Sequence, residues 1–194
     1  EALSEENSYA GNLPEPLERA KMIALSDVFE RVFGFAPKIF RSGRYGFGPN
    51  TAQILKDLGY EVDLSQFAHR DFSSDGGPDF TAVSTAPVFL DDGKTLLSIP
   101  ATSGCLGPLR RWGNGILRFC DTPVARFLHI RGLLVRLGLF GWTWLSPEGV
   151  ALRSAKSLTS ALMQDGGQVY LMSFHSPSLV PGNTTYVQND RDKR

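Results

Sequence analysis

The order of helical and extended patterns along the chain is the feature that most limits its fold. Five apolar residues recur at spacings of three and four: Leu17, Ala20, Ala24, Val28 and Val32. This stripe predicts a helix that begins near Pro14 and ends at Gly34. Short strand candidates follow at residues 38–40 and 60–64, and a second helix is predicted between them, from Pro49 to Gly59. Because strands that alternate with helices form parallel sheets, we predict an α/β fold.

The second half of the chain continues this alternation. Residues 88–90 and 96–99 flank Asp91-Asp92-Gly93 and predict a β-hairpin, with the Asp-Gly pair at the positive-φ positions of the turn. Two more helices are predicted, one from Asp121-Thr122-Pro123 and one from Ser146-Pro147-Glu148 to Gly166-Gly167. Residues 169–174 are the strongest strand candidate. The polar stretch 65–86 is predicted to be a long loop, of the kind that is functional or disordered.

Length and charge restrict the class of protein. The 194 residues predict a single domain, 1–194, and the 20 basic and 20 acidic side chains cancel. A general nucleic-acid binder would carry a basic excess, so that class is excluded. No run of 18 apolar residues exists, which excludes a membrane span. Residues 1–36 carry a net charge of −4 and residues 105–136 one of +5, which indicates either two solvated faces or a basic rim that attracts anionic substrates.

Candidate chemistry lies where the predicted strands end, since ligands of α/β folds collect beyond those ends. Arg41, Arg44 and Tyr45 follow the first strand, and an arginine there would be partly buried and would require a carboxylate. Asp63, after the second strand, is either that carboxylate or a plain surface charge. His175 directly follows the last strand candidate, where barrel enzymes place acids and bases. The sequence is equally consistent with an ordinary, half-buried histidine on a turn.

Three signals for other chemistries are weak or absent. Gly43, Gly46 and Gly48 form either a tight turn or a phosphate-binding loop, but they match no nucleotide-binding motif. Cys105 and Cys120 have no metal-ligand spacing, and no pair of histidines has the spacing of a metal site. The spacing of residues alone therefore predicts an α/β domain with Arg and His at strand ends, and no metal site.

Three short segments resemble those of a known family. They are Phe40-Arg41-Ser42-Gly43-Arg44-Tyr45-Gly46, Leu58-Gly59-Tyr60-Glu61-Val62-Asp63-Leu64-Ser65 and Ser173-Phe174-His175-Ser176-Pro177-Ser178-Leu179. In this order and spacing they resemble the polysaccharide deacetylases of the NodB-homology type, over about residues 7–187. The resemblance implies a deformed (β/α) barrel that removes N- or O-acetyl groups from a sugar polymer. It also implies a divalent metal, commonly zinc, held by one Asp and two His, and a second Asp as base.

The resemblance assigns roles to residues of this chain. His175 would be the general acid, and Arg41 would orient the base, although the motif here is longer than the family's usual Arg-x-Pro and Arg44 could take that role. Arg44, Tyr45, Asp63 and Ser176 would contact the sugar. The compartment, the sugar and the acetylated position stay open.

The family's metal ligands should precede Arg41, and this chain departs from that pattern. Asp27 is the only Asp before Arg41 and no His precedes it. Because the first residue is Glu1 rather than Met, we expect an N-terminally truncated barrel that also lacks its C-terminal closing helix. The parent protein would then be a metal-dependent carbohydrate deacetylase, whereas this chain alone would hold no catalytic metal and be inactive.

Two alternatives remain at this point. The first is a non-catalytic carbohydrate-binding or scaffolding protein that uses Tyr45, Trp112, Trp142 and Trp144 as sugar platforms, although such rings are also ordinary core residues. The second is a phosphate- or nucleotide-binding module built on the glycines at 43, 46 and 48.

Overall fold

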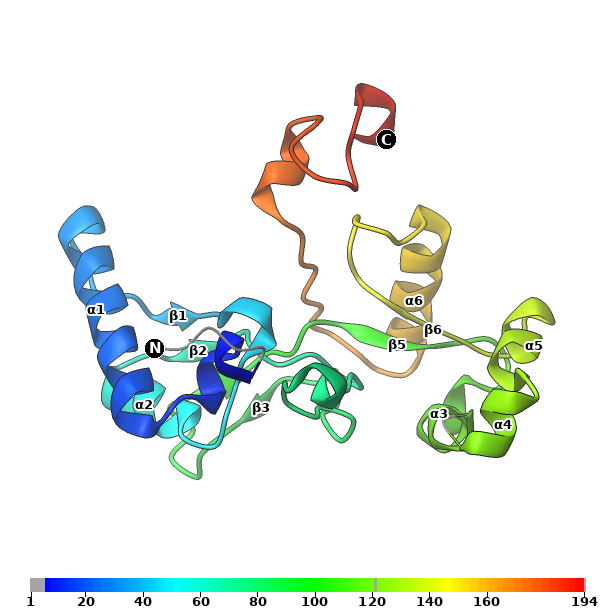
Figure 1. Cartoon of the computed structure of the whole chain (residues 1–194), viewed down its shortest axis with the longest axis horizontal. Coiled ribbons are helices and arrows are strands. Elements are labelled where there is room, and N and C mark those ends of the chain that lie inside the picture. The colour runs from blue at the N-terminus through cyan, green and yellow to red at the C-terminus, as the bar shows by residue number, and fades with distance from the viewer. Residues whose placement is uncertain (1–5, 121, 194) are drawn as a thin grey trace. The chain divides into compact units, whose positions relative to one another are not determined.

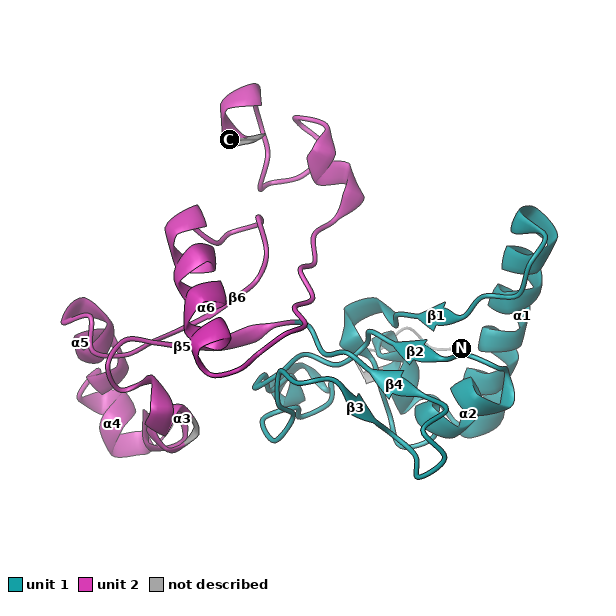
Figure 2. Cartoon of the chain, turned by 180° about the vertical axis from the view of Figure 1, so that it is seen from behind, with its two compact units in different colours: residues 1–101 teal, residues 102–194 magenta. Residues whose placement is uncertain are grey.

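The chain divides into two compact units, residues 1–101 and 102–194 (Figures 1 and 2). This is a computed structural model, and it describes residues 6–120 and 122–193. The sequence predicts one domain, 1–194, and within it each of the two units has its own sheet and its own helices. The prediction of an α/β chain is confirmed. Among the described residues, no helix is long and apolar enough to cross a bilayer.

Unit 1 is built on a four-stranded sheet with the order β1-β2-β4-β3. Strands β1 (Ile39–Phe40), β2 (Val62–Asp63) and β4 (Leu97–Ser98) are parallel, with Ile39 opposite Val62 and Val62 opposite Leu97. Strand β3 (Val88–Phe89) is antiparallel to β4, so the predicted hairpin is confirmed. Its turn differs in detail, because Lys94, with φ 54°, takes the left-handed conformation expected of the Asp-Gly pair.

Both predicted helices of unit 1 are present, but α1 buries a different face. Helix α1 (Glu15–Phe33) ends at Gly34 with φ 78°, and α2 (Thr51–Asp57) ends two residues before Gly59. The predicted apolar stripe of α1 faces solvent, and Val32 is 68% exposed. The buried face instead carries Glu18 and Met22. It is set by contacts outside the helix, since Thr51 Oγ1 of α2 donates a 2.5 Å hydrogen bond to Glu18 Oε1.

The core of unit 1 lies between these helices and the sheet. Its buried members are Met22, Phe40, Ile54, Leu55, Tyr60 and Leu96. The predicted loop 65–86 is irregular but ordered, because it buries Phe67, Ala68 and Phe80 and pairs Asp71 with Asp79. Short 3-10 turns complete the unit: η1 (Glu6–Ser8), η2 (Ala10–Asn12), η3 (Gly43–Tyr45) and η4 (Ser73–Asp75).

Unit 2 is built on one antiparallel pair of strands, β5 (Ser103–Leu106) and β6 (Gly141–Trp144), which the sequence analysis did not predict. Helix α6 (Leu152–Gln164) packs on this pair through Leu158, which is fully buried. Gly104 lies beneath that side chain, where a Cβ would come within 2.9 Å of Leu158 Cδ1. The turns η5 (Arg110–Trp112), η6 (Ser176–Leu179) and η7 (Asp190–Lys193) belong to the same unit.

Three helices occupy the connection from β5 to β6: α3 (Gly113–Cys120), α4 (Pro123–Phe127) and α5 (Ile130–Arg136). The predicted start at Thr122-Pro123 is confirmed, since Thr122 Oγ1 accepts the Ala125 N–H and Pro123 opens α4. Asp121 lies outside the described residues. Figure 1 shows the three helices gathered at one end of the unit.

Two predictions for unit 2 are wrong. Helix α6 begins at Leu152 rather than at Ser146, because Ser146 Oγ accepts the Glu148 N–H and closes a local turn before the helix. Residues 169–174 form no regular strand. Their backbone bonds are too sparse for a ladder: Leu171 O accepts from Thr102 N, and Ser173 N donates to Leu145 O.

Candidate functional site

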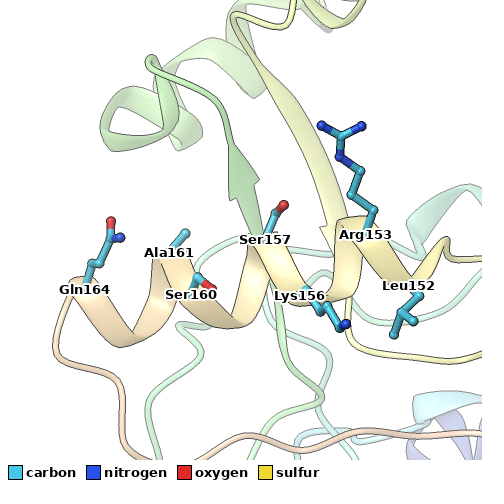
Figure 3. A pocket seen from close by; sticks show the side chains of 7 residues that line it. All are labelled: Leu152, Arg153, Lys156, Ser157, Ser160, Ala161 and Gln164. Carbon is cyan, nitrogen blue, oxygen red and sulfur yellow. The ribbon is translucent and has the colours of Figure 1, made fainter.

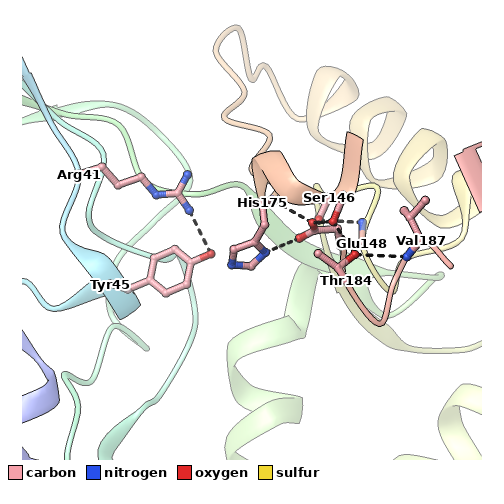
Figure 4. Close-up of polar contacts among 8 residues, drawn as sticks. Arg41, Tyr45, Ser146, Glu148, His175, Thr184 and Val187 are labelled. Carbon is pink, nitrogen blue, oxygen red and sulfur yellow. Dashed lines mark hydrogen bonds and ion pairs between the residues drawn. The ribbon is translucent and has the colours of Figure 1, made fainter. Parts of the chain in front are cut away.

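A buried carboxylate holds the predicted acid, His175, in place within unit 2 (Figure 4). The Nδ1 atom of His175 lies 2.7 Å from Glu148 Oε2, and the backbone N–H of the same histidine donates to Glu148 Oε1 at 2.8 Å. Because an ionised carboxylate only accepts hydrogen bonds, Nδ1 carries the proton in this pair. The other ring nitrogen, Nε2, is then left for a ligand.

The two partners differ sharply in exposure. The Glu148 side chain is 7% exposed, whereas the His175 side chain is 73% exposed. Glu148 Oε1 also accepts a 2.5 Å hydrogen bond from Ser178 Oγ, which lies 3.0 Å from Thr184 Oγ1. A buried, well-bonded carboxylate therefore presents an accessible imidazole, whose ring stacks parallel to that of Tyr186 at 6.5 Å.

The hydrogen bonds around Glu148 keep it charged. Burial raises the pKa of Glu148, but the hydrogen bonds from Ser178 and from the backbone and ring of His175 outweigh burial and hold that pKa below its usual value. The carboxylate is therefore ionised at neutral pH. An ionised carboxylate on Nδ1 fixes the ring orientation and leaves Nε2 as the nitrogen that can give a proton to a bound group or accept one from it.

Glu148 is the functional residue that the sequence analysis missed. It was interpreted as part of a helix start, and it lies 27 residues before His175. No periodicity joins residues so far apart, and only the fold of unit 2 brings them together. Ser176, predicted to contact the sugar, is exposed at the start of η6, while its neighbour Ser178 makes the contact with Glu148.

Arg41, Tyr45 and Arg44 lie together in unit 1, beyond the end of β1. Arg41 Nη2 donates a 3.4 Å hydrogen bond to Tyr45 Oη, and its guanidinium lies 5.4 Å from the centre of that ring (Figure 4). Arg44 instead stacks on the ring of Tyr9 at 4.8 Å. The described residues place no carboxylate within 4 Å of Arg41, so its charge remains available to an anionic or polar ligand.

Tyr45 is held by neighbouring rings and by an unusual backbone. Its ring stacks on Phe72 at 5.5 Å and meets Phe67 edge-on at 4.9 Å. Arg44 and Tyr45 both have positive φ, 54° and 58°, a left-handed conformation that costs non-glycine residues roughly 1–2 kcal/mol each. Such strain persists only where the surroundings enforce it, and it is concentrated at functional sites.

Two of the three glycines of this loop, Gly46 and Gly48, serve packing. A Cβ on Gly46 would come within 2.7 Å of Ala10 N, and one on Gly48 would overlap the Gly11 carbonyl. Gly46 O also accepts the Gly11 N–H at 3.0 Å. The N-terminal segment therefore packs directly against Gly46 and Gly48, which favours the tight-turn interpretation of these two glycines.

Asp63 is not the carboxylate partner of Arg41, which was one of its two predicted roles. It is fully buried, Oδ1 accepts the Ser65 N–H at 3.1 Å, and Oδ2 lies 3.4 Å from Ser98 Oγ. Desolvation raises the pKa of Asp63 to about 6, although the hydrogen bonds from Ser65 and Ser98 act against that rise. Ser65 Oγ in turn accepts the Ser42 N–H next to Arg41. Asp63 thus supports the loop from inside the unit and does not reach a solvent-borne sugar.

The residues implied as metal ligands by the resemblance were also sought. Among residues 6–120 and 122–193, no group of three or more His, Cys, Asp or Glu side chains could hold a metal ion. His69 is part-buried with an unpartnered Nδ1, and His129 is exposed at the start of α5. The described residues therefore do not fit the expected metal.

A separate hollow of about 590 Å³ runs along α6 (Figure 3). Its lining residues are Leu152, Arg153, Lys156, Ser157, Ser160, Ala161 and Gln164. None of them is a histidine or a carboxylate, and the hollow is distinct from the Glu148–His175 pair.

No protein-family model, curated protein or solved structure matches the chain. The functional argument therefore depends on the chemistry of the described side chains, above all on the Glu148–His175 pair in unit 2 and on the loop of Arg41 and Tyr45 in unit 1.

Proposed function

We propose that the protein is a carbohydrate deacetylase, for which this chain supplies a proton donor and residues that contact the sugar. The observation that carries the proposal is the buried Glu148 carboxylate, which binds Nδ1 of the exposed His175 at 2.7 Å. A carboxylate–imidazole pair of this kind is what an enzyme needs to protonate a leaving group. The order of the three sequence segments that resemble NodB-type deacetylases supplies the reaction class.

The proton step follows from this geometry. Addition of water to the acetyl carbon gives a tetrahedral intermediate, which collapses as the bond from carbon to the sugar nitrogen or oxygen breaks. The leaving atom would take the electron pair of that bond and a proton from Nε2 of His175. Glu148 stays ionised and holds the ring while His175 becomes neutral. Acetate and the free amine or hydroxyl are the products.

Arg41 and Tyr45 support the sugar side of the proposal. A tyrosine held on Phe72 offers an apolar face and a hydroxyl, and the neighbouring guanidinium offers fixed donors to sugar oxygens. The parallel strands β1, β2 and β4, with α2 between the first two, agree with the proposed incomplete (β/α) barrel. Activation of the water is assigned to none of the described residues, because they do not fit the metal that the resemblance implies.

The decisive experiment measures acetate release from a panel of N- and O-acetylated oligosaccharides. The product of the complete open reading frame and the 194-residue chain are compared, each with and without added Zn²⁺. We expect the complete product to release acetate. In its His175→Gln variant, we expect kcat to be lower than in the wild type by about 10²–10⁴-fold, with KM unchanged within about threefold. His129→Gln is the matched control, because that histidine is exposed and outside the Glu148 network.

Two results would overturn the proposal. One is a complete product that releases no acetate from any member of the panel. The other is a His175→Gln variant that keeps the wild-type kcat.

Carbohydrate binding without hydrolysis is the second candidate, favoured by the Tyr45–Phe72 stack beside Arg41. It predicts that the chain binds acetylated and deacetylated oligosaccharides alike and that His175→Gln leaves the Kd unchanged. Isothermal titration with both forms of one oligosaccharide separates it from the deacetylase proposal, together with the acetate assay.

A further inference from the structure

Helices α3, α4 and α5 of unit 2 expose their large apolar residues and bury small ones. Ala125 is 1% exposed, whereas Phe127, two residues later, is 82% exposed. Nine large apolar side chains are exposed over residues 112–139, which run from the end of η5 to just past α5, and six of them are Trp112, Phe119, Val124, Phe127, Leu133 and Leu137. A helix that packs only against its own domain shows the opposite arrangement, so this segment is built to contact something else.

The exposed residues are ordered along the helices. Val124, Phe127 and Leu128 have the spacing i, i+3, i+4 and form one stripe that runs past the end of α4. Leu133 and Leu137 have the spacing i, i+4 along α5. Thus α4 presents one apolar side, whereas α5 also exposes Val135 and is apolar over more of its surface.

The same segment carries a strong positive charge. Residues 105–140 contain six Arg and one Asp, in a chain whose total charge is zero. Five of these arginines are exposed: Arg111, Arg118, Arg126, Arg131 and Arg136. Only Arg110 pairs with a described carboxylate, that of Asp165 at 3.3 Å. We name the six apolar and five basic side chains the basic apolar face.

The structure assigns this basic apolar face to the surface of an anionic lipid bilayer. Arginines interleaved with exposed Trp, Phe and Leu on short helices are the pattern of segments that lie in the headgroup region. The apolar side chains enter the acyl boundary, and the guanidiniums bind lipid phosphates. A nucleic acid would use the arginines and could stack on the aromatic rings, but it would leave the aliphatic side chains of Val124, Leu133 and Leu137 in water, so the lipid surface accounts for more of the face.

This inference does not depend on the deacetylase proposal. It concerns how the protein is localised to a surface, whereas the proposed chemistry concerns His175 and Arg41. The helices α3, α4 and α5 have eight, five and seven residues, which is enough to lie on a bilayer and too short to cross it.

The test is flotation of the 194-residue chain with anionic vesicles, made of phosphatidylcholine and phosphatidylglycerol in a ratio of roughly 7:3. Vesicles of phosphatidylcholine alone are the neutral control. We expect binding to the anionic vesicles that weakens by at least about tenfold at 0.5 M salt. We also expect a blue shift of Trp112 emission, seen as the difference between the wild type and a Trp112→Phe variant.

Two pairs of variants separate the contributions. Val124→Ser with Phe127→Ser should weaken binding by about tenfold or more, while Val28→Ser with Val32→Ser on the exposed side of α1 should not. Arg126→Gln with Arg136→Gln should weaken it by roughly thirtyfold, while Arg153→Gln with Lys156→Gln on α6 should leave it within about threefold. All eight positions are exposed, so the fold should persist.

The proposal is wrong if the wild-type chain does not float with anionic vesicles. It is also wrong if either control double variant loses as much vesicle binding as the test double variant with which it is compared. Self-association of the wild type that is abolished by the Val124 and Phe127 changes, without any vesicle binding, would show that the face joins two copies of the chain instead.

Discussion

The Nδ1 atom of His175 and the Oε2 atom of Glu148 lie 2.7 Å apart, although 27 residues separate them in the chain. The contact joins an exposed ring to a buried carboxylate that also accepts the Ser178 hydroxyl. One residue therefore has two roles. Glu148 orients the proposed acid and ties the segment 175–178 to the body of unit 2.

Replacing Glu148 should reveal both roles. In Glu148→Gln, the amide nitrogen of the new side chain cannot accept the hydrogen bonds that His175 and Ser178 donate to the carboxylate. We therefore expect the free energy of unfolding to fall by about 2 kcal/mol. Urea unfolding followed by Trp fluorescence reports on unit 2 alone, because Trp112, Trp142 and Trp144 all belong to it. Glu61→Gln, an exposed position of unit 1, is the control and should leave the transition unchanged.

The glycine loop gives a second prediction, with a control five residues away. A Cβ on Gly48 would overlap the Gly11 carbonyl, so Gly48→Ala should destabilise unit 1 by about 3 kcal/mol or more. Gly43 has nothing within 4 Å of its Cβ position, so Gly43→Ala should be neutral or slightly stabilising. Thermal unfolding by circular dichroism compares the two. Equal stability of both variants would contradict the tight packing inferred here.

The sequence predicted those elements that local signals define. Helix α1 ends at Gly34 and α4 begins behind Thr122 because a glycine in the left-handed region and a capping hydroxyl act within one turn. The short strands β1 and β2 lie within the predicted segments 38–40 and 60–64.

Features that depend on distant parts of the chain could not be predicted in this way. The spacing of apolar residues on α1 favoured the side of Val28, but the Thr51 hydroxyl of α2 selects the side of Glu18. Residues 169–174 are apolar enough for a strand, yet Thr102 and Leu145 bond to their backbone without forming a regular ladder. The Glu148–His175 contact likewise requires the fold of unit 2.

The raised pKa of Asp63 lets us predict how the free energy of unfolding of unit 1 changes with pH. Its pKa rises from 3.8 to about 6 on folding because the carboxyl is buried, so the folded state binds more protons between pH 4 and 6. This contribution is fully present below pH 4 and is lost as the pH rises through about 6, with a limit of about 3 kcal/mol. The protonated acid donates to Ser98 Oγ, which then donates to Gln66 Oε1 at 3.2 Å.

The test of this linkage is Asp63→Asn, whose amide mimics the protonated acid. We expect it to stabilise unit 1 at pH 7 and to have little effect at pH 4. Hydrogen exchange of the buried amides of Ile54 and Leu55, corrected for the intrinsic rate, measures this directly. Asp92→Asn, at an exposed position of the hairpin turn, should change neither value. An Asp63→Asn variant with the same pH dependence as the wild type would exclude the linkage.

The two loop arginines should separate into a functional one and a structural one, if the deacetylase proposal holds. Arg44 covers the ring of the buried Tyr9, so Arg44→Gln should cost roughly 0.5–1 kcal/mol of stability and leave kcat/KM within about threefold. Arg41 is exposed and contacts Tyr45, so Arg41→Gln should leave the Tm unchanged and lower kcat/KM by about 10². Acetate-release kinetics of the complete product and its thermal unfolding give the two readouts. The reverse pattern would assign the sugar-contacting role to Arg44 and leave Arg41 as a surface charge.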